Sequence, residues 1–282
     1  MNNYEEIVMK HYSQVAASEG NSSLSTMKNE YVRQQETNAI TNTIALYLAE
    51  RKDIITVFDV GCGNGYTLSI IHQQFPELKL IGIEKNRELR HIAQERFCGV
   101  DNISIVEGDV LEDMSNRIGT ADIVYCQRVV INLLDRNDQE IAYKNIGRLV
   151  RDKGLFFCIE CMKAPLDNLN QARNEYGLQP IKASFHNLYM DEAVFSNLGN
   201  FVKWEKDGLT DKNFLSTHYY VNRVLYDLSL QGKEFKMNSH FVSFFTNAFA
   251  PNIGEYSPIQ YFCFMKKADG MPNIEEKKKC GY

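Results

Sequence analysis

The stretch VFDVGCGNGYTL (residues 57–68) places three closely spaced glycines behind an aspartate and an apolar run. The β-branched run before the glycines (54–60) is typical of a buried strand, and the residues after it (65–75) return to helical spacing ahead of Pro76. Glycines between a strand and a helix let a ligand approach the backbone and the helix N-terminus. The stretch therefore predicts a ligand-binding turn in an α/β fold.

The same alternation of strand-like and helix-like segments continues around this turn. Short apolar runs predict further strands at KLIGIE (79–84), ISIVEGD (103–109), ADIVYCQ (121–127) and LFFCIE (155–160). Segments with helical spacing predict helices over residues 28–52, 87–97 and 138–152. Strands that alternate with helices are typical of a parallel sheet covered on both faces.

The alternation stops at about residue 162, where a long polar and aromatic stretch begins. Further strands are expected at FVKWEK (201–206) and IQYFCFMKK (259–267). A structureless loop of this length is uncommon in a compact domain. We therefore expect an inserted cap over the carboxyl edge of the sheet, where open α/β sheets bind their ligands.

Composition excludes several classes of protein. A chain of 282 residues that is 44% hydrophobic and 24% charged suits one large domain or a domain with an insertion. Apolar runs fall short of the roughly 20 residues that cross a bilayer, and the N-terminus lacks the pattern of a signal peptide. We therefore expect no membrane insertion and a cytoplasmic location. The net charge of −5 argues against a nucleic-acid partner.

The cysteines indicate neither disulfides nor a metal site. There are seven, an odd number, and most lie in apolar strand-like runs, which predicts reduced and buried thiols. Cys158 and Cys161 form a CxxC motif, but no second pair has the spacing of zinc ligands. We expect no bound metal.

The residues around the glycines indicate which ligand the turn binds. A dinucleotide-binding turn has the pattern GxGxxG, but Tyr66 takes the place of the third glycine, and the lysine of a P-loop is absent. Asp59 would repel a pyrophosphate and attract an ammonium group. Glu84 ends the next strand, where a ribose-binding carboxylate belongs, and Asp109 follows the strand after it, in place to accept from an adenine amine. Together they describe a nucleoside joined to a charged amino acid.

The ordered motifs DVGCGNG, GIE, EGDV and ADIVYCQRVVINL resemble the class I methyltransferases that use S-adenosylmethionine, over about residues 30–160. The resemblance implies a Rossmann-like fold with a seven-stranded, mostly parallel sheet, helices on both faces and an inserted cap after the fifth strand. It implies that the glycines contact the amino-acid part of the cofactor, Glu84 the ribose, Asp109 and Val110 the adenine. The whole expected cofactor-binding set is Arg33, Asp59, Gly61, Cys62, Gly63, Gly65, Glu84, Lys85, Asp109, Val110, Gln127, Arg128 and Asn132.

Short blocks further along the chain carry a second resemblance. QRVVINLLD, LDNLNQARNEYGLQPI, FHNLYMDE and FLSTHYYVNRVLY are similar to a bacterial group that includes phosphonate O-methyltransferases and methyltransferases encoded with surface-polysaccharide genes. This resemblance implies that residues 162–250 build the acceptor pocket. A motif of the Asn-Pro-Pro-Tyr kind is absent after the fourth strand, which argues against methylation of adenine or of a glutamine amide.

Basic and tyrosyl side chains in this region suit an anionic acceptor, because arginine forks and tyrosine hydroxyls can hold a phosphoryl group. Arg33 could serve the acceptor or the carboxylate of the cofactor. The expected acceptor-binding residues are Tyr31, Arg173, Lys182, His186, Tyr189, His218, Tyr219 and Arg223, and those expected to act in catalysis are His186, Arg173, Lys182 and Tyr31.

Two mechanisms of methyl transfer remain open. An ionised phosphoryl oxygen of a phosphonate, phosphoramidate or phosphate needs no general base, and the expected function is O-methylation of such an acceptor. A sugar or natural-product hydroxyl would need a base, for which His186 or His218 is suited. An amine N-methyltransferase, a nicotinamide-dependent oxidoreductase and a non-catalytic cofactor-binding subunit also remain open as classes of protein. The sequence does not define the oligomeric state.

The expected organisation has four parts. Residues 1–52 form an N-terminal helical segment that covers the site, and 53–161 form the cofactor-binding core. Residues 162–268 form the acceptor-binding cap and the last strands, and 269–282 form a flexible tail.

Overall fold

The computed structural model describes residues 3–22, 25, 27–51, 53 and 55–268, and the expected tail at 269–282 lies outside these residues. A seven-stranded sheet organises the chain in the order β3-β2-β1-β4-β5-β7-β6. Its strands are β1 (Thr56–Val60), β2 (Lys79–Glu84), β3 (Ile103–Glu107), β4 (Ala121–Gln127), β5 (Val150–Cys161), β6 (Phe201–Lys203) and β7 (Ile259–Lys266).

The first five strands run parallel, and the remaining two complete a mixed edge. β7 pairs antiparallel with β5, from Leu155 opposite Met265 to Cys161 opposite Ile259, and β6 pairs antiparallel with β7. The strand order changes direction between β1 and β4, so the turns after these two strands lie next to each other. Such a switch point at the carboxyl ends of the strands is where open α/β sheets bind ligands.

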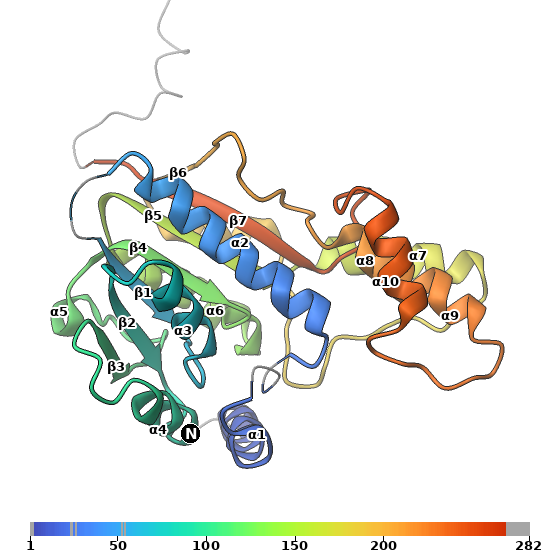
Figure 1. Cartoon of the computed structure of the whole chain (residues 1–282), viewed down its shortest axis with the longest axis horizontal. Helices are drawn as coiled ribbons and strands as arrows, with labels where there is room; N and C mark the ends of the chain where they lie inside the picture. The colour runs from blue at the N-terminus through green and yellow to red at the C-terminus, as the bar shows by residue number, and fades with distance from the viewer. Residues whose placement is uncertain (1–2, 23–24, 26, 52, 54, 269–282) are drawn as a thin grey trace, which may run out of the picture.

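Helices cover the sheet because its central strands are apolar on both faces. Phe58, Tyr125, Phe156 and Phe157 are almost fully buried in the core. Figure 1 shows the long helix α2 lying across the sheet. The helices along the core are α2 (Glu30–Leu48), α3 (Tyr66–Gln74), α4 (Arg87–Arg96), α5 (Ser115–Ile118) and α6 (Arg136–Leu149).

The N-terminal helix α1 (Asn3–Glu19) packs beside α4 rather than on the sheet (Figure 1). Ser13 Oγ donates to Glu88 Oε2 at 2.9 Å, and Asn86 Nδ2 donates to Ser13 Oγ at 3.1 Å. These bonds place α1 over the carboxyl ends of β1 and β2.

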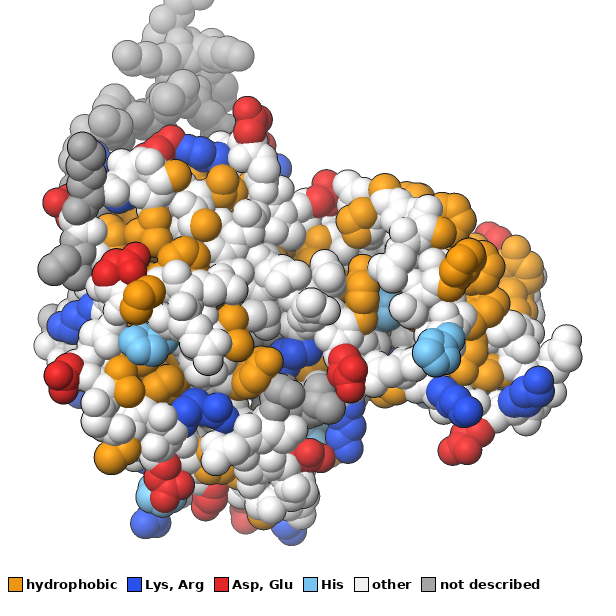
Figure 2. Space-filling model, in the orientation of Figure 1, with side chains coloured by type: hydrophobic (Ala, Val, Ile, Leu, Met, Phe, Trp, Pro, Cys, Tyr) orange, Lys and Arg blue, Asp and Glu red, His pale blue; other side chains and the backbone are white. Residues whose placement is uncertain are grey.

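The cap forms a helical lobe beyond one end of the sheet (Figure 1). It is built from α7 (Lys163–Glu175), α8 (Ser216–Tyr220), the π-helical turn η3 (Val221–Leu225), α9 (Tyr226–Ser229) and α10 (His240–Ala248), whereas the 3-10 helix η2 (Glu192–Leu198) packs against α6. Figure 2 shows hydrophobic side chains on the surface of this lobe, and Phe244, Phe249 and Ile253 are more than half exposed. The insertion after the fifth strand is confirmed.

Two expected elements differ in extent. The helix expected over 138–152 ends at Leu149, because Val150 already pairs with Ala121 in the sheet, and an irregular part of β5 with Lys153 at a φ of 59° follows. The strand expected over 201–206 covers only Phe201–Lys203, which pair with the end of β7.

Candidate active site

A cavity of about 860 Å³ opens at the switch point of the sheet. Its floor is formed by the turns after β1, β2, β3 and β4, and α1 and part of the cap enclose it from above. All of the expected cofactor-binding residues except Gly65 line it. The expected acceptor residues His186, Tyr189 and Tyr219 line the same cavity. One continuous space therefore joins the glycine turn to the cap.

Two glycines of the opening stretch supply bare backbone at this cavity. Gly61 and Gly63 have φ values of 76° and 57°, in the left-handed region that favours glycine. Glu84, at the end of β2, holds the glycine turn in place, because its Oε2 accepts from Gly63 N at 2.8 Å. Its Oε1 accepts from Asn86 N at 2.7 Å. Burial raises the pKa of Glu84, while the backbone bonds act in the opposite direction.

Gly65 serves packing instead of lining the cavity. It precedes α3, and a Cβ there would come within 2.7 Å of the Phe97 ring and 3.3 Å of Ala93 Cβ. Gly65 therefore lies outside the lining of the cavity, and its missing side chain lets α3 approach α4.

Asp59 is a buried carboxyl group beneath the glycine turn. Burial, and to a smaller extent the negative charge of Glu84, raise the pKa of Asp59 to about 7. A cationic group entering the cavity would stabilise the ionised carboxylate. This position is consistent with the ammonium-bearing ligand expected from the sequence.

The turns after β2 and β3 form the other end of the floor. Lys85 Nζ lies 2.6 Å from Asp109 Oδ2, and Asp109 Oδ1 accepts from Leu111 N at 2.9 Å. Asn145 Nδ2 donates to the carbonyl of Val110 at 3.0 Å, which holds the same turn from α6. The Asp109 carboxylate and the backbone beside it are therefore fixed at the cavity wall.

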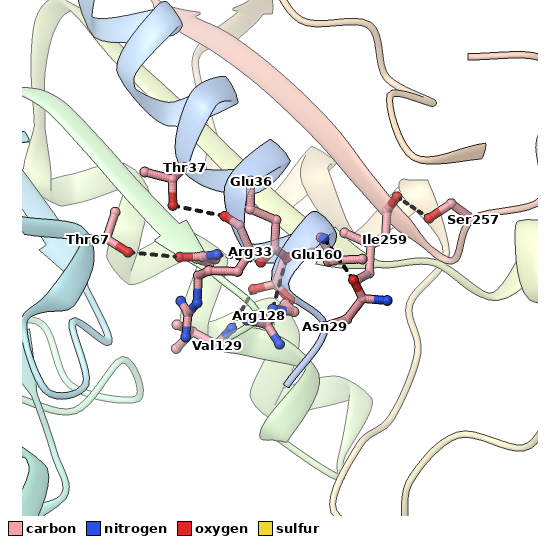
Figure 3. Close-up of polar contacts among 12 residues, drawn as sticks. Asn29, Arg33, Glu36, Thr37, Thr67, Arg128, Val129, Glu160, Ser257 and Ile259 are labelled. Carbon is pink, nitrogen blue, oxygen red and sulfur yellow. Dashed lines mark hydrogen bonds and ion pairs between the residues drawn. The ribbon is translucent and has the colours of Figure 1, made fainter. Parts of the chain in front are cut away.

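The end of β4 and the turn after it bring two polar side chains to the cavity. Gln127 Nε2 donates to Glu36 Oε2 at 2.7 Å, and Arg128 Nε lies 3.0 Å from Glu36 Oε1 (Figure 3). Beneath the turn, Glu160 Oε1 accepts from the backbone N–H groups of Val129 and Val130, both at 2.9 Å. Burial raises the pKa of Glu160 to about 7.

Glu36 and Glu160 were missed by sequence reasoning. Glu36 had a detectable signal, because it lies four residues before Ile40 and eight before Ile44, on the buried face of α2. A charged residue on an apolar helical face needs a buried partner. Glu160 ends an otherwise apolar run, and nothing in the sequence shows that its carboxylate binds the backbone of the turn after β4.

Arg33 lies one helical turn from Glu36 and enters the cavity from α2. Its guanidinium carbon is 5.6 Å from the centre of the Tyr66 ring. Burial and the charge of Arg128 lower the pKa of Arg33 to about 10, so it remains protonated at neutral pH. Arg33 therefore adds a second guanidinium, besides that of Arg128, to the wall of the cavity.

The far end of the cavity is lined by the cap. His186 belongs to the loop after α7, and its ring stacks on His11 of α1 with centroids 4.3 Å apart. His186 Nδ1 is buried and has no hydrogen-bond partner among the described residues. Burial and the neighbouring His11 lower the pKa of His186, which favours the neutral imidazole at neutral pH. Tyr189 and Tyr219 line the wall beside it.

Helix α1 closes the mouth between the two ends. Tyr12 Oη donates to Asn132 Oδ1 at 3.0 Å, which joins α1 to the turn after β4. The residues of α1 on the cavity wall are Val8, Met9, His11, Tyr12 and Val15. A covering N-terminal segment was expected from the sequence, but none of these side chains was predicted to line the site.

Several expected acceptor residues lie away from the cavity. Arg173 Nη1 pairs with Asp227 Oδ2 at 2.6 Å and also donates to the carbonyl of Arg223, inside the cap. The Arg223 guanidinium lies over the ring of Phe235, and Lys182 is exposed. The cationic cluster expected from these three residues is therefore corrected, because their side chains hold the cap together or face solvent.

Tyr31 and His218 form a contact between α2 and the cap. Their rings stack with centroids 4.5 Å apart, and neither residue lines the cavity. His218 Nε2 lies 3.1 Å from Asn29 Nδ2, and its Nδ1 lies 3.3 Å from Thr246 Oγ1. Burial lowers the pKa of His218 to about 4. Both ring nitrogens are occupied, so the structure corrects the expectation that His218 faces an acceptor.

The described residues contain no group of three or more histidine, cysteine, aspartate and glutamate side chains that could hold a metal ion. Within the same part of the chain, none of the helices combines the length and apolar character needed to cross a bilayer.

Comparison with known proteins agrees with this geometry. Residues 57–154 match the family described as methyltransferase domain. A curated relative, an uncharacterized protein of Methanothermobacter thermautotrophicus, is 24% identical over 137 residues, which cover 49% of this chain and 48% of the relative. The chain thus spans about half the length of the curated relative it matches.

Solved structures share the fold at low identity. A putative sarcosine dimethylglycine methyltransferase from Galdieria sulphuraria is 14% identical with a TM-score of 0.53, over 93% of this chain and 98% of that one. Geranyl diphosphate C-methyltransferase from Streptomyces coelicolor, solved with S-adenosyl-L-homocysteine, is 11% identical with a TM-score of 0.55, over 95% and 99%. Phosphoethanolamine N-methyltransferase 1 from Haemonchus contortus is 13% identical with a TM-score of 0.54, over 98% and 52%.

The matched segment, the strand order and the site define the class. Residues 57–154 match a methyltransferase domain, and the fold is that of the class I enzymes that use S-adenosylmethionine. The expected fold and cofactor are confirmed at this level.

Proposed function

We propose that this chain transfers a methyl group from S-adenosylmethionine to a hydroxyl oxygen of a small acceptor. The observation that carries the proposal is the single cavity that joins the glycine turn to His186, Tyr189 and Tyr219. It is large enough to place a cofactor and a small acceptor end to end, and mixed polar and apolar walls suit such ligands.

The residues present fit the cofactor. Asp59 and the backbone of the glycine turn would hold its ammonium group, and Arg33 its carboxylate. Glu84 would accept from the ribose hydroxyls, and Asp109 from the adenine amine. The support lies in the buried carboxyl of Asp59 and in the Glu84 carboxylate, which is already oriented by two backbone N–H groups.

S-adenosylmethionine supplies a methyl group already activated for in-line displacement by its positively charged sulfur. The protein therefore mainly has to align the acceptor oxygen and exclude water. Helix α1 and the cap enclose the cavity, and the bond from Tyr12 to Asn132 holds α1 against the sheet. His186 would remove the proton of the acceptor hydroxyl with its imidazole, because this residue lines the cavity and its neutral form is favoured.

A phosphoryl oxygen is the second candidate acceptor. Arg33 and Arg128 line the cavity and could hold an anion, which favours a phosphonate, phosphoramidate or phosphate. However, Arg173, Lys182 and Arg223 do not reach this space, so the anionic pocket expected from the sequence loses most of its cations. The hydroxyl acceptor is better supported because it uses the His186 imidazole.

Replacing His186 by alanine separates the two acceptors. With a hydroxyl acceptor, we expect kcat to fall by about 100-fold, the usual scale for loss of a general base, with little change in KM. The wild-type rate should decline only below about pH 6.5, because burial lowers the pKa of His186 and the neutral ring is the active form. Steady-state kinetics between pH 5 and 8 measure both effects.

The exposed His91 on α4 offers the matched control, and His91→Ala should leave both constants unchanged. A His186→Ala variant that keeps its kcat and raises only KM would point to the phosphoryl acceptor instead.

A further inference from the structure

The turn after β4 carries backbone strain at a bulky residue. Arg128 has a φ of 55°, in the left-handed region that side chains other than glycine rarely adopt. Its N–H donates to the carbonyl of Ile159 at 2.8 Å, so the strained residue is still tied to β5. Such conformations persist only where the surroundings hold them, and they cluster at functional sites.

Buried carboxylates hold this turn from two sides. Glu160 binds the backbone of Val129 and Val130 from within the sheet. Glu36 of α2 binds the side chains of Gln127 and Arg128 from above, and its side chain is 0% exposed (Figure 3). Glu160 therefore orients the backbone after Arg128, whereas Glu36 orients the two side chains that reach the cavity.

Stability alone is a weak explanation for the Glu36 contacts. Burying an ion pair removes two charges from water, and the attraction regained often only balances that cost. The apolar side chains of Ile40 and Ile44 already anchor α2 against the core. The main consequence of the Glu36 carboxylate is thus geometric: it fixes Gln127 and Arg128 at the cavity wall.

We propose that Glu36 is a positioning residue for the cofactor. By holding Gln127 and Arg128, it preorganises the part of the cavity wall that these two side chains form, and it links α2 to cofactor affinity. This inference rests on the proposed function only in assuming that the cavity binds this cofactor.

Binding of S-adenosyl-L-homocysteine, measured by calorimetry on the full chain, tests the proposal without an acceptor. Glu36→Gln keeps the size of the side chain but removes the charge that Arg128 faces. We expect its Kd to rise at least tenfold. Glu30→Gln is the matched control, because Glu30 is an exposed residue of the same helix, and its Kd should not change.

A double-mutant cycle with Arg128→Met shows whether Glu36 acts through Arg128. Each single variant should have a higher Kd for S-adenosyl-L-homocysteine than the wild type. The Kd of the double variant should not exceed the higher of the two single-variant values, because the same contact is lost only once. Losses that multiply would overturn the proposal. So would a Glu36→Gln protein with a lowered melting temperature and the Kd of the wild type, since its role would then be structural. If the wild type itself binds no S-adenosyl-L-homocysteine, the proposed function fails instead.

Discussion

Replacing Glu84 by alanine is expected to weaken cofactor binding by 100-fold or more. The variant would lose the carboxylate that we propose accepts from the two ribose hydroxyls, and each hydrogen bond to such a charged group contributes about 1.5 kcal/mol or more. It would also release the N–H groups of Gly63 and Asn86, which Glu84 now binds at 2.8 and 2.7 Å. Calorimetric titration with S-adenosyl-L-homocysteine measures the effect.

Glu107 provides the control for this prediction. It lies opposite Glu84 in the register of β2 and β3, but its side chain is 72% exposed and pairs with Arg90. Glu107→Ala should therefore leave the Kd unchanged. Equal losses in the two variants, or none in Glu84→Ala, would show that Glu84 does not contact the cofactor.

Gly61→Ala is expected to lower both stability and cofactor affinity. The new Cβ would lie 2.4 Å from Cγ2 of Val129, and the residue would keep a φ of 76°. Left-handed backbone costs about 1–2 kcal/mol for a residue with a side chain, and overpacking adds roughly 1–3 kcal/mol. The displaced Val129 belongs to the turn after β4, so the cavity wall should move as well. Denaturant unfolding and cofactor titration measure the two losses.

A matched glycine separates strain from overpacking. Gly99 has a φ of 81°, and a Cβ there would meet nothing within 4 Å. Gly99→Ala should therefore show only the cost of strain and bind the cofactor normally. Adding Val129→Ala to Gly61→Ala should restore part of the lost affinity. A double variant no better than Gly61→Ala would mean that contact with Val129 is not the cause.

The fold and the cofactor end of the site could be predicted because their signals are local. Strand and helix periods define the elements, and Asp59, Glu84 and Asp109 each lie at or just after the end of a strand, at the same edge of the sheet. Once the strands are parallel, these ends must meet. The spacing of the glycines then distinguishes a dinucleotide from a nucleoside joined to an amino acid.

The acceptor end could not be predicted in the same way, because it depends on how the cap folds back. Arg173 and Arg223 lie 50 residues apart, and their contact inside the cap leaves no trace in the spacing of either residue. His186 lines the cavity in a loop that also meets His11 of α1. These contacts join segments with no shared period, so sequence patterns identify suitable residue types without showing which ones meet.

The most direct test of the proposed function is methyl transfer from S-adenosylmethionine labelled in its methyl group. The acceptor panel contains nucleotide-linked sugars, other small hydroxyl compounds, phosphonates, phosphoramidates and amines, and mass spectrometry locates the label in each product. The account predicts a product labelled on a carbon-bound hydroxyl oxygen, whose formation falls with His186→Ala. Label on a phosphoryl oxygen or an amine nitrogen would contradict the hydroxyl acceptor, and tight cofactor binding without transfer to any acceptor class would contradict the enzyme itself.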